Sequence, residues 1–229
     1  MRSALTSLLF ACAALPAAAD PVVVELFTAQ GCSSCPPADA LLSEIAADED
    51  VIALSLHVDY WDWIGWRDTF AKPAFTERQY AYAAGDGTSV VYTPQFVVGG
   101  SDVIAGPSGI ELAKVLDAHG SVTDDVLRIA SSPEGREVMA MPMKNVEAAE
   151  LVLVTYLPQA QVRVLHGENA GRVMDYHNIV HGWDVLAPWS GANVTVPLPD
   201  APKGMRQVVL AQSLEDGRPG AILGAVRAD

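Results

Sequence analysis

Hydrophobic and polar positions follow different patterns in the first and second halves of the chain. From Pro21 to about Gly120, short apolar runs rich in β-branched residues alternate with stretches of helical period. In "ADALLSEIAAD", for example, Leu41, Leu42 and Ile45 fall on one helical face. The pattern predicts buried strands at 22–28, 51–60 and 95–100, a hairpin partner at 101–106 and a closing helix within 107–120. This alternation predicts an α/β domain over about residues 20–120.

Two further features refine this half. Ser108 and Glu111 have the spacing of a capping box, and Gly120 follows the apolar period, so the closing helix has both a start and a stop signal. The long segment 61–87, between the second and third predicted strands, has mixed patterning. We expect it to form a partly helical insertion.

From about Val122 the rhythm changes to eight short alternating runs separated by turns, with no long helical period. Runs of this length at nearly regular spacing are typical of an antiparallel β-sandwich. The sequence therefore predicts an all-β, sandwich-like domain over residues 121–229. The runs are "DVLRIASS", "EVMAMPM", "AELVLVTYLP", "QVRVLHGE", "RVMDYHNIV", "ANVTVPL", "RQVVLAQSL" and "AILGAVR".

The first nineteen residues have the pattern of a secretory signal peptide. Arg2 supplies the positive charge, the apolar stretch 4–15 is too short to span a bilayer, and alanines 17–19 resemble a cleavage site. We expect a mature chain that begins near Asp20, with a periplasmic or secreted location and no later membrane span. A lipoprotein site at Cys12 is the alternative.

Net charge narrows the range of partners. The formal charge is −14 and no basic patch interrupts the acidic residues. We therefore expect neither nucleic acid nor an anionic membrane surface as a partner. The sequence also contains no phosphate loop, nucleotide fingerprint or serine–histidine–acid grouping, so we expect no cofactor. Oligomeric state is not predicted.

Removal of a signal peptide would leave two cysteines, Cys32 and Cys35, in the stretch "CSSC" between a predicted strand and a predicted helix. The start of a helix favours a thiolate over a thiol, and the thiolate is the attacking species in disulfide exchange. Cys32 precedes the helix and is expected to be the more exposed, attacking thiol, with Cys35 resolving the mixed disulfide. Pro36 and Pro37 predict that the regular helix begins at one of them.

Two other interpretations of the cysteine pair stay open. A structural disulfide is one, although a bridge across so short a loop stabilises a fold weakly. A copper or zinc site is the other, with His57 and Asp59 at the end of the second strand as further ligands to the two thiolates. Copper(I) is the ion best matched to soft sulfur ligands.

An aromatic cluster follows the second strand. Tyr60, Trp61, Trp63 and Trp66 lie within seven consecutive residues. Such side chains are common anchors for a binding partner, and they also fill gaps between packed elements. A third functional hypothesis is therefore an interaction module that works through these rings and the β-rich half.

These residues carry a resemblance. Strand, "CSSC", helix and the later "YTPQFVVGG" resemble the thioredoxin fold, whose members place a cis proline opposite the dithiol; Thr93-Pro94 matches that position. More narrowly, "ELFTAQGCSSCPPADALL", "HVDYWDWIGWRDTFA" and "YTPQF" are similar to a secreted bacterial thioredoxin-like family, domain of unknown function 1223.

That resemblance implies an α/β thioredoxin-like domain with a reactive cysteine pair, and it implies no established reaction. From the residues and the resemblance together, we expect a thiol–disulfide oxidoreductase acting on the thiols or disulfides of another protein. The backbone of Thr93, beside Pro94, is expected to pair with an extended substrate.

Overall fold

The computed structural model describes residues 21–120, 126–133 and 135–228. The expected signal peptide and Cys12 therefore lie outside the described residues. The helices are α1 (Pro36–Ile45), α2 (Pro73–Gly85) and α3 (Gly109–His119), with a 3-10 turn η1 (Asp62–Ile64). The strands are β1 (Val22–Thr28), β2 (Val51–His57), β3 (Gln95–Val98), β4 (Asp102–Ala105), β5 (Leu127–Ser132), β6 (Gly135–Ala140), β7 (Ala149–Arg163), β8 (Val173–Trp189), β9 (Val194–Leu198), β10 (Arg206–Glu215) and β11 (Arg218–Arg227).

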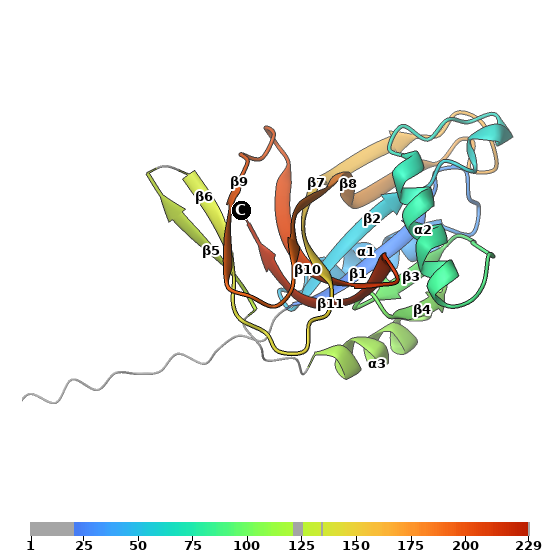
Figure 1. The fold of residues 1–229 in the computed structure, drawn as a ribbon. Coiled ribbons are helices and arrows are strands. Elements are labelled where there is room, and N and C mark those ends of the chain that lie inside the picture. Colours follow the sequence, from blue (N-terminus) through green and yellow to red (C-terminus); the bar gives the residue numbers. More distant parts are fainter. Residues whose placement is uncertain (1–20, 121–125, 134, 229) are drawn as a thin grey trace, which may run out of the picture.

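A large mixed sheet forms the centre of the molecule (Figure 1). Its strand order is β11-β10-β7-β8-β2-β1-β3-β4. Strand β1 runs parallel to β2 and antiparallel to β3, and β4 pairs with β3 as the predicted hairpin. A second sheet has the order β5-β6-β9. The fold is thus mixed α/β, with one large and one small sheet.

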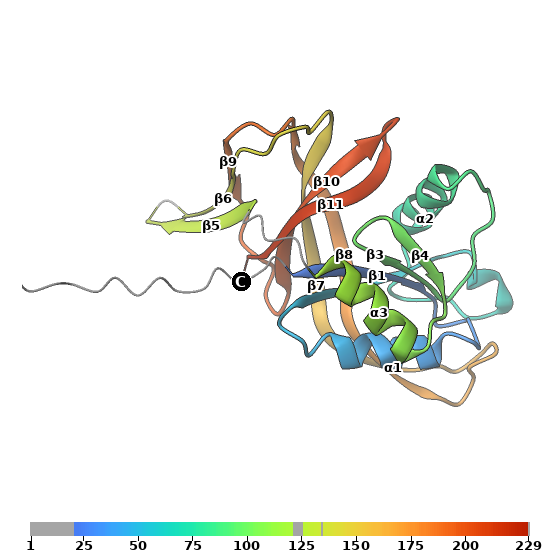
Figure 2. The same cartoon turned by 90° about the horizontal axis from the view of Figure 1, so that it is seen from below.

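Helices cover both faces of the part of the large sheet that contains β1. α1 and α3 lie on one face and α2 on the other (Figure 2). The strand period explains the arrangement, because successive side chains of a strand point to opposite faces. In β1, Val24 and Leu26 pack with α1 and α3, whereas Val23 and Phe27 pack on the α2 side.

Most predicted elements of the first half are confirmed. α1 begins at Pro36, directly after Cys35, as the two prolines predicted. Ser108 and Glu111 form both bonds of a capping box at the start of α3. Segment 61–87 contains η1 and all of α2, so the insertion is partly helical.

The second half is all β over its described residues, but its runs join into longer strands than the pattern indicated. Two predicted runs merge into β7, and Pro158 is the last residue of the first of them. The merger is possible because β10 pairs with β7 only as far as Tyr156, so Pro158 lies on an edge that needs no N–H donor.

The large sheet continues across the expected domain boundary near residue 120. β8 lies beside β2 through the parallel pair Ser55 and Ile179, and Asn178 Nδ2 donates to the carbonyl of Ala53 at 2.9 Å. The three-stranded sheet packs against the face of β7 and β10 that carries Leu151 and Val209. Strands from the C-terminal half thus belong to two sheets, one of which they share with β1 and β2.

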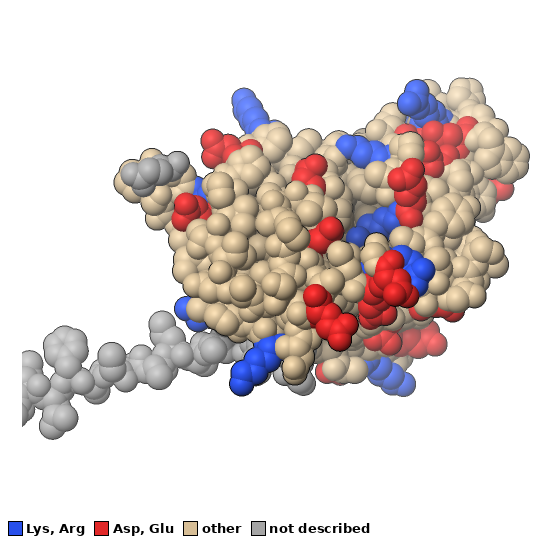
Figure 3. Space-filling model, viewed as in Figure 1, with Lys and Arg blue, Asp and Glu red and all other residues tan. Residues whose placement is uncertain are grey.

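The surface matches the acidic composition. On the face shown in Figure 3, acidic side chains are scattered over the molecule and the basic ones form no continuous patch. Within the described residues, no helix is both long enough and apolar enough to cross a membrane.

Candidate functional site

Cys32 and Cys35 are joined by a disulfide at the start of α1. The backbone N–H of Cys32 donates to Ala29 O at 3.1 Å, and the N–H of Cys35 donates to Cys32 O at 3.3 Å, so the loop consists of two consecutive tight turns. Cys35 is the N-cap of α1 and Pro36 and Pro37 are its first two residues. The sequence thus folds the pair into a short, closed loop directly before the helix.

The two prolines change the electrostatics that the sequence suggested. A helix normally presents several free N–H groups at its start, but Pro36 and Pro37 have none. The next N–H, from Ala38, donates to Cys35 O at 2.8 Å. Less backbone donor capacity is therefore left for a thiolate here than at an ordinary helix start. Ser34 Oγ, 3.4 Å from Cys32 Sγ, is the nearby side-chain hydroxyl.

The expectation that Cys32 is the more exposed thiol is wrong for the disulfide form, because both cysteines are fully buried. Residues distant in sequence cover them. Trp61, from the insertion, packs against the core cluster that contains both cysteines. Gly31 is so close to the insertion that an added Cβ would lie 2.9 Å from Ile64 Cδ1. The pattern of the sequence could not show this cover.

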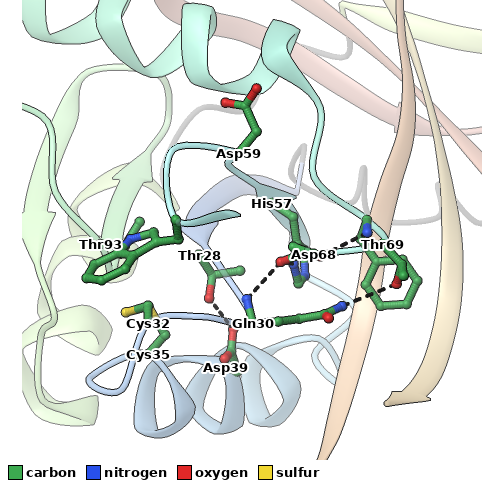
Figure 4. Close-up of polar contacts among 12 residues, drawn as sticks. Thr28, Gln30, Cys32, Cys35, Asp39, His57, Asp59, Asp68, Thr69 and Thr93 are labelled. Atoms are coloured by element: carbon green, nitrogen blue, oxygen red, sulfur yellow. Dashed lines mark hydrogen bonds and ion pairs between the residues drawn. A yellow bond between two sulfur atoms is a disulfide. The ribbon is translucent and has the colours of Figure 1, made fainter. Parts of the chain in front are cut away.

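The Thr93–Pro94 segment lies across from the disulfide loop, as predicted, and its peptide bond is cis. Ser34 Oγ donates to Thr93 O at 3.4 Å, and Trp61 Nε1 donates to Thr93 Oγ1 at 2.8 Å. Figure 4 shows Thr93 and Cys32 near each other above α1. Trp61 therefore bridges the insertion to this segment beside the cysteine pair.

The four aromatic residues divide between packing and exposure. Trp66 Nε1 donates to Gln30 Oε1 at 2.8 Å, and Tyr60 OH donates to Gln79 Oε1 at 3.1 Å. Burial raises the pKa of Tyr60 to about 12. Trp63, by contrast, is 81% exposed. Only Trp63 of this group projects fully into solvent.

His57 is the last residue of β2, at the strand end where the sequence placed it, and it is paired with the carboxylate of Asp68. His57 Nδ1 lies 2.7 Å from Asp68 Oδ2, and the backbone N–H of Gln30 donates to the same oxygen at 2.7 Å (Figure 4). Burial alone would raise the pKa of Asp68, but the charge of a protonated His57 and the hydrogen bonds to the carboxylate lower it overall. Asp68 thereby ties the insertion to both β2 and the cysteine loop.

Asp39 is a buried carboxyl group one turn into α1, on the same side of the helix as Cys35. Thr28 Oγ1 donates to Asp39 Oδ1 at 2.8 Å (Figure 4), and Asp39 Oδ2 has no hydrogen-bond partner. Burial raises the pKa of Asp39 to about 7, partly offset by the charge of His57 and the bond from Thr28. The site thus contains an acid that titrates near neutral pH.

The alternative metal ligands are not brought together. Asp59 Oδ1 accepts from Thr76 Oγ1 at 2.6 Å, and His57 is engaged with Asp68. Within the described ranges, no three or more His, Cys, Asp or Glu side chains are grouped to hold a metal ion. The two sulfur atoms are bonded to each other.

Four polar residues at the site were missed by the reading of the sequence: Gln30, Asp39, Asp68 and Asn169. Asp39 gave a signal, because it falls within the apolar face of the predicted helix, between Cys35 and Leu42. Asn169 gave none, since it lies in a turn 137 residues after Cys32. Its role depends on the path of the β7–β8 hairpin.

Comparison with known proteins places this mixed α/β chain in a family. Residues 23–212 match the family described as "Protein of unknown function (DUF1223)", and the chain belongs to it. A crystal structure of a protein from Agrobacterium tumefaciens is 33% identical, with a TM-score of 0.80, and covers 91% of this chain and 94% of that one.

A second solved structure, HBP35 of Porphyromonas gingivalis, is 14% identical, with a TM-score of 0.63. The alignment covers 92% of this chain and 75% of that one. At this identity the likeness concerns the fold alone. No curated protein matches the chain.

Proposed function

We propose that this protein is an exported thiol–disulfide oxidoreductase that exchanges electrons with another protein through Cys32 and Cys35. The observation that carries the proposal is the disulfide itself, placed in the loop that enters α1 with the buried acid Asp39 one helical turn beyond it. The two bridged cysteines are only three positions apart in the sequence, so the loop that the disulfide closes is very short. A disulfide across so short a loop stabilises the fold weakly, so it is better suited to reversible thiol–disulfide exchange than to a structural role.

The arrangement of the first half supports a thioredoxin-like interpretation of the fold. The order β2-β1-β3-β4, with β1 and β2 parallel and β3 and β4 antiparallel, resembles the thioredoxin core. So does the distribution of the helices, with α1 and α3 opposite α2. The cysteine pair lies between β1 and α1, where that fold places a reactive dithiol.

In the proposed reaction, a partner thiolate attacks Cys32 Sγ, and the bond from Cys32 to Cys35 breaks. Cys35 leaves with the electron pair and takes a proton from Asp39, whose raised pKa leaves it partly protonated near neutral pH. A second partner thiolate then attacks the partner's own sulfur in the mixed disulfide. Cys32 is released as a thiolate, the partner gains a disulfide, and two electrons have moved to this protein. The same steps in reverse reduce a partner disulfide.

Because both cysteines are buried, exchange requires the covering residues to move. Trp61 is one of these residues, and its Nε1 donates to Thr93 Oγ1 at 2.8 Å. The exposed Trp63 in the same segment is the natural first contact for a partner. A partner that binds Trp63 could thereby displace Trp61 from the disulfide.

The test is a trapped intermediate. In Cys35→Ser, a partner disulfide attacked by Cys32 cannot be resolved, so we expect mixed disulfides on non-reducing gels that disappear on reduction. Cys32→Ser is the matched control and should form none. Equal adducts in both variants, or a Cys35→Ser protein that reacts with no disulfide probe, would refute the proposal.

Metal analysis of the reduced protein separates this function from metal binding. Stoichiometric copper or zinc that is lost in Cys32→Ser would favour the metal hypothesis. Oxidoreductase function predicts equal, negligible metal in the two proteins.

A further inference from the structure

The β7–β8 hairpin carries the C-terminal half over the cysteine loop. Its tip, residues 164–172, is closed by the Val164 N–H donating to Arg172 O at 3.0 Å and the Gly171 N–H donating to Val164 O at 2.9 Å. The tip contacts the insertion as well. A Cβ on Gly167, whose φ is +78°, would lie 3.2 Å from Ile64 Cδ1. The tip is therefore fixed at both its base and its outer side.

Asn169, in this tip, is 1% exposed and reaches the cysteine loop. Its Nδ2 donates to Gln30 O and to Cys32 O, each at 2.9 Å. An amide nitrogen has two protons, and both are used on carbonyl groups that flank Gly31. Residues 137 and 139 positions earlier in the chain are thus held by one side chain.

The contact is specific to the reactive loop. The carbonyl of Cys32 also accepts the N–H of Cys35, so Asn169 binds one of the atoms that define the turn between the two sulfurs. If Asn169 were lost, two buried carbonyl groups would lose a partner, and the loop would gain freedom in the reduced state. A disulfide forms readily when its two thiols are held together, and less readily when one of them moves freely.

We propose that Asn169 is a positioning residue for the disulfide, which keeps Cys32 placed to bond with Cys35 and keeps the pair closed to solvent. The inference rests on the proposed function, since it gives the C-terminal half a part in that chemistry. It predicts that loss of Asn169 makes the disulfide easier to reduce and faster to open, beyond any effect on the stability of the hairpin.

The test uses the full mature chain, oxidised, with dithiothreitol as the reductant. Dithiothreitol supplies two electrons and two protons and becomes a cyclic disulfide, while the protein disulfide becomes two thiols. For Asn169→Ala we expect a shift of about tenfold toward the dithiol at equilibrium and an opening rate faster by at least a similar factor, from the loss of two hydrogen bonds.

Asn178→Gly is the matched control. Asn178 Nδ2 also donates to a backbone carbonyl of the first half, that of Ala53, at 2.9 Å, away from the cysteine loop. Its φ is +48°, which glycine accepts without strain. We expect its redox equilibrium to stay within about twofold of wild type. Asn169→Ser, which keeps one donor, should fall between wild type and Asn169→Ala and serves if the alanine variant does not fold.

The outcomes are distinct. Asn169 variants with wild-type redox equilibrium and opening rate, but lower unfolding stability, would overturn the inference and leave the proposed function in place. A wild-type disulfide that does not open under native conditions, beside an Asn169→Ala disulfide that does, would support the inference and count against the proposed function. A disulfide that opens in neither protein would overturn both.

Discussion

At the scale of single residues, the site is a set of buried polar groups around one disulfide. Gln30 is fully buried and connects the loop to the insertion, because its N–H binds Asp68 and its Oε1 accepts from Trp66. Asp39 has one carboxyl oxygen without a hydrogen-bond partner, and the same holds for His57 Nε2 and Asn169 Oδ1. Buried polar groups usually find partners, so such an exception marks a residue worth testing.

The pH dependence of stability is a prediction about Asp39. Its pKa is raised in the folded protein, from 3.8 to about 7, so the folded state binds more protons than the unfolded state between these values. The stabilising contribution of Asp39 to the free energy of unfolding is therefore fully present below about pH 4, and it is lost as the pH rises through 7. The loss amounts to at most about 4 kcal/mol.

Asp39→Asn removes this titration and can still accept from Thr28. We expect urea unfolding to give similar stability for the two proteins at pH 4, and a variant more stable by about 2 kcal/mol or more at pH 8.5. Parallel stability profiles for variant and wild type across this range would show that Asp39 does not titrate as stated.

At the scale of elements, the docking of α2 depends on the guanidinium of Arg78, whose side chain is 10% exposed. Arg78 forms two bonds to Glu25 in β1, at 2.6 and 2.8 Å, and its guanidinium lies 3.7 Å from the centre of the Trp183 ring. The same guanidinium donates to Gln212 of β10 at 2.9 Å. One side chain on α2 thus joins strands from both halves of the sequence.

Arg78→Met should destabilise the protein strongly. Glu25 is fully buried and would be left as an uncompensated charge, so we expect a loss of about 3–5 kcal/mol in urea unfolding. Arg218→Met removes an exposed pair with Asp216 and should cost less than about 1 kcal/mol. If Arg78→Met costs no more than the Arg218 control, the ion pair does not hold α2 in place.

At the scale of the whole molecule, the two halves share a sheet and a core. The core on the α2 side of the sheet contains Phe27 and Leu54 from the first half and Val152, Tyr156 and Leu210 from the second. Removing the second half would expose this surface and leave β2 as an open edge.

A fragment of residues 21–120 is therefore expected not to fold by itself. Size-exclusion chromatography and thermal unfolding should show association or a non-cooperative transition, whereas the chain 21–229 should be folded and cooperative. A monomeric fragment with a sharp unfolding transition would mean that the first half is an independent unit despite the shared sheet.

Local patterns predicted the elements because local physics sets them. β-branched runs gave β1, β2 and β3, the prolines gave the start of α1, and Ser108 with Glu111 gave the start of α3. The same patterns could not show how far β7 and β8 extend, because strand length depends on which edges are paired.

The sequence by itself determined that two cysteines lie between a strand and a helix that begins at a proline, because these features depend on local spacing and on proline geometry. The place of Thr93 and Pro94 across from the cysteines was implied only by the family resemblance. Only the tertiary structure decided that the disulfide is buried, that Asp39 is bound by Thr28 and Asp68 by Gln30, and that Asn169 binds the cysteine loop. The physical reason is that burial and long-range hydrogen bonds arise when segments more than a hundred residues apart pack together. No local pattern encodes where a hairpin tip will lie.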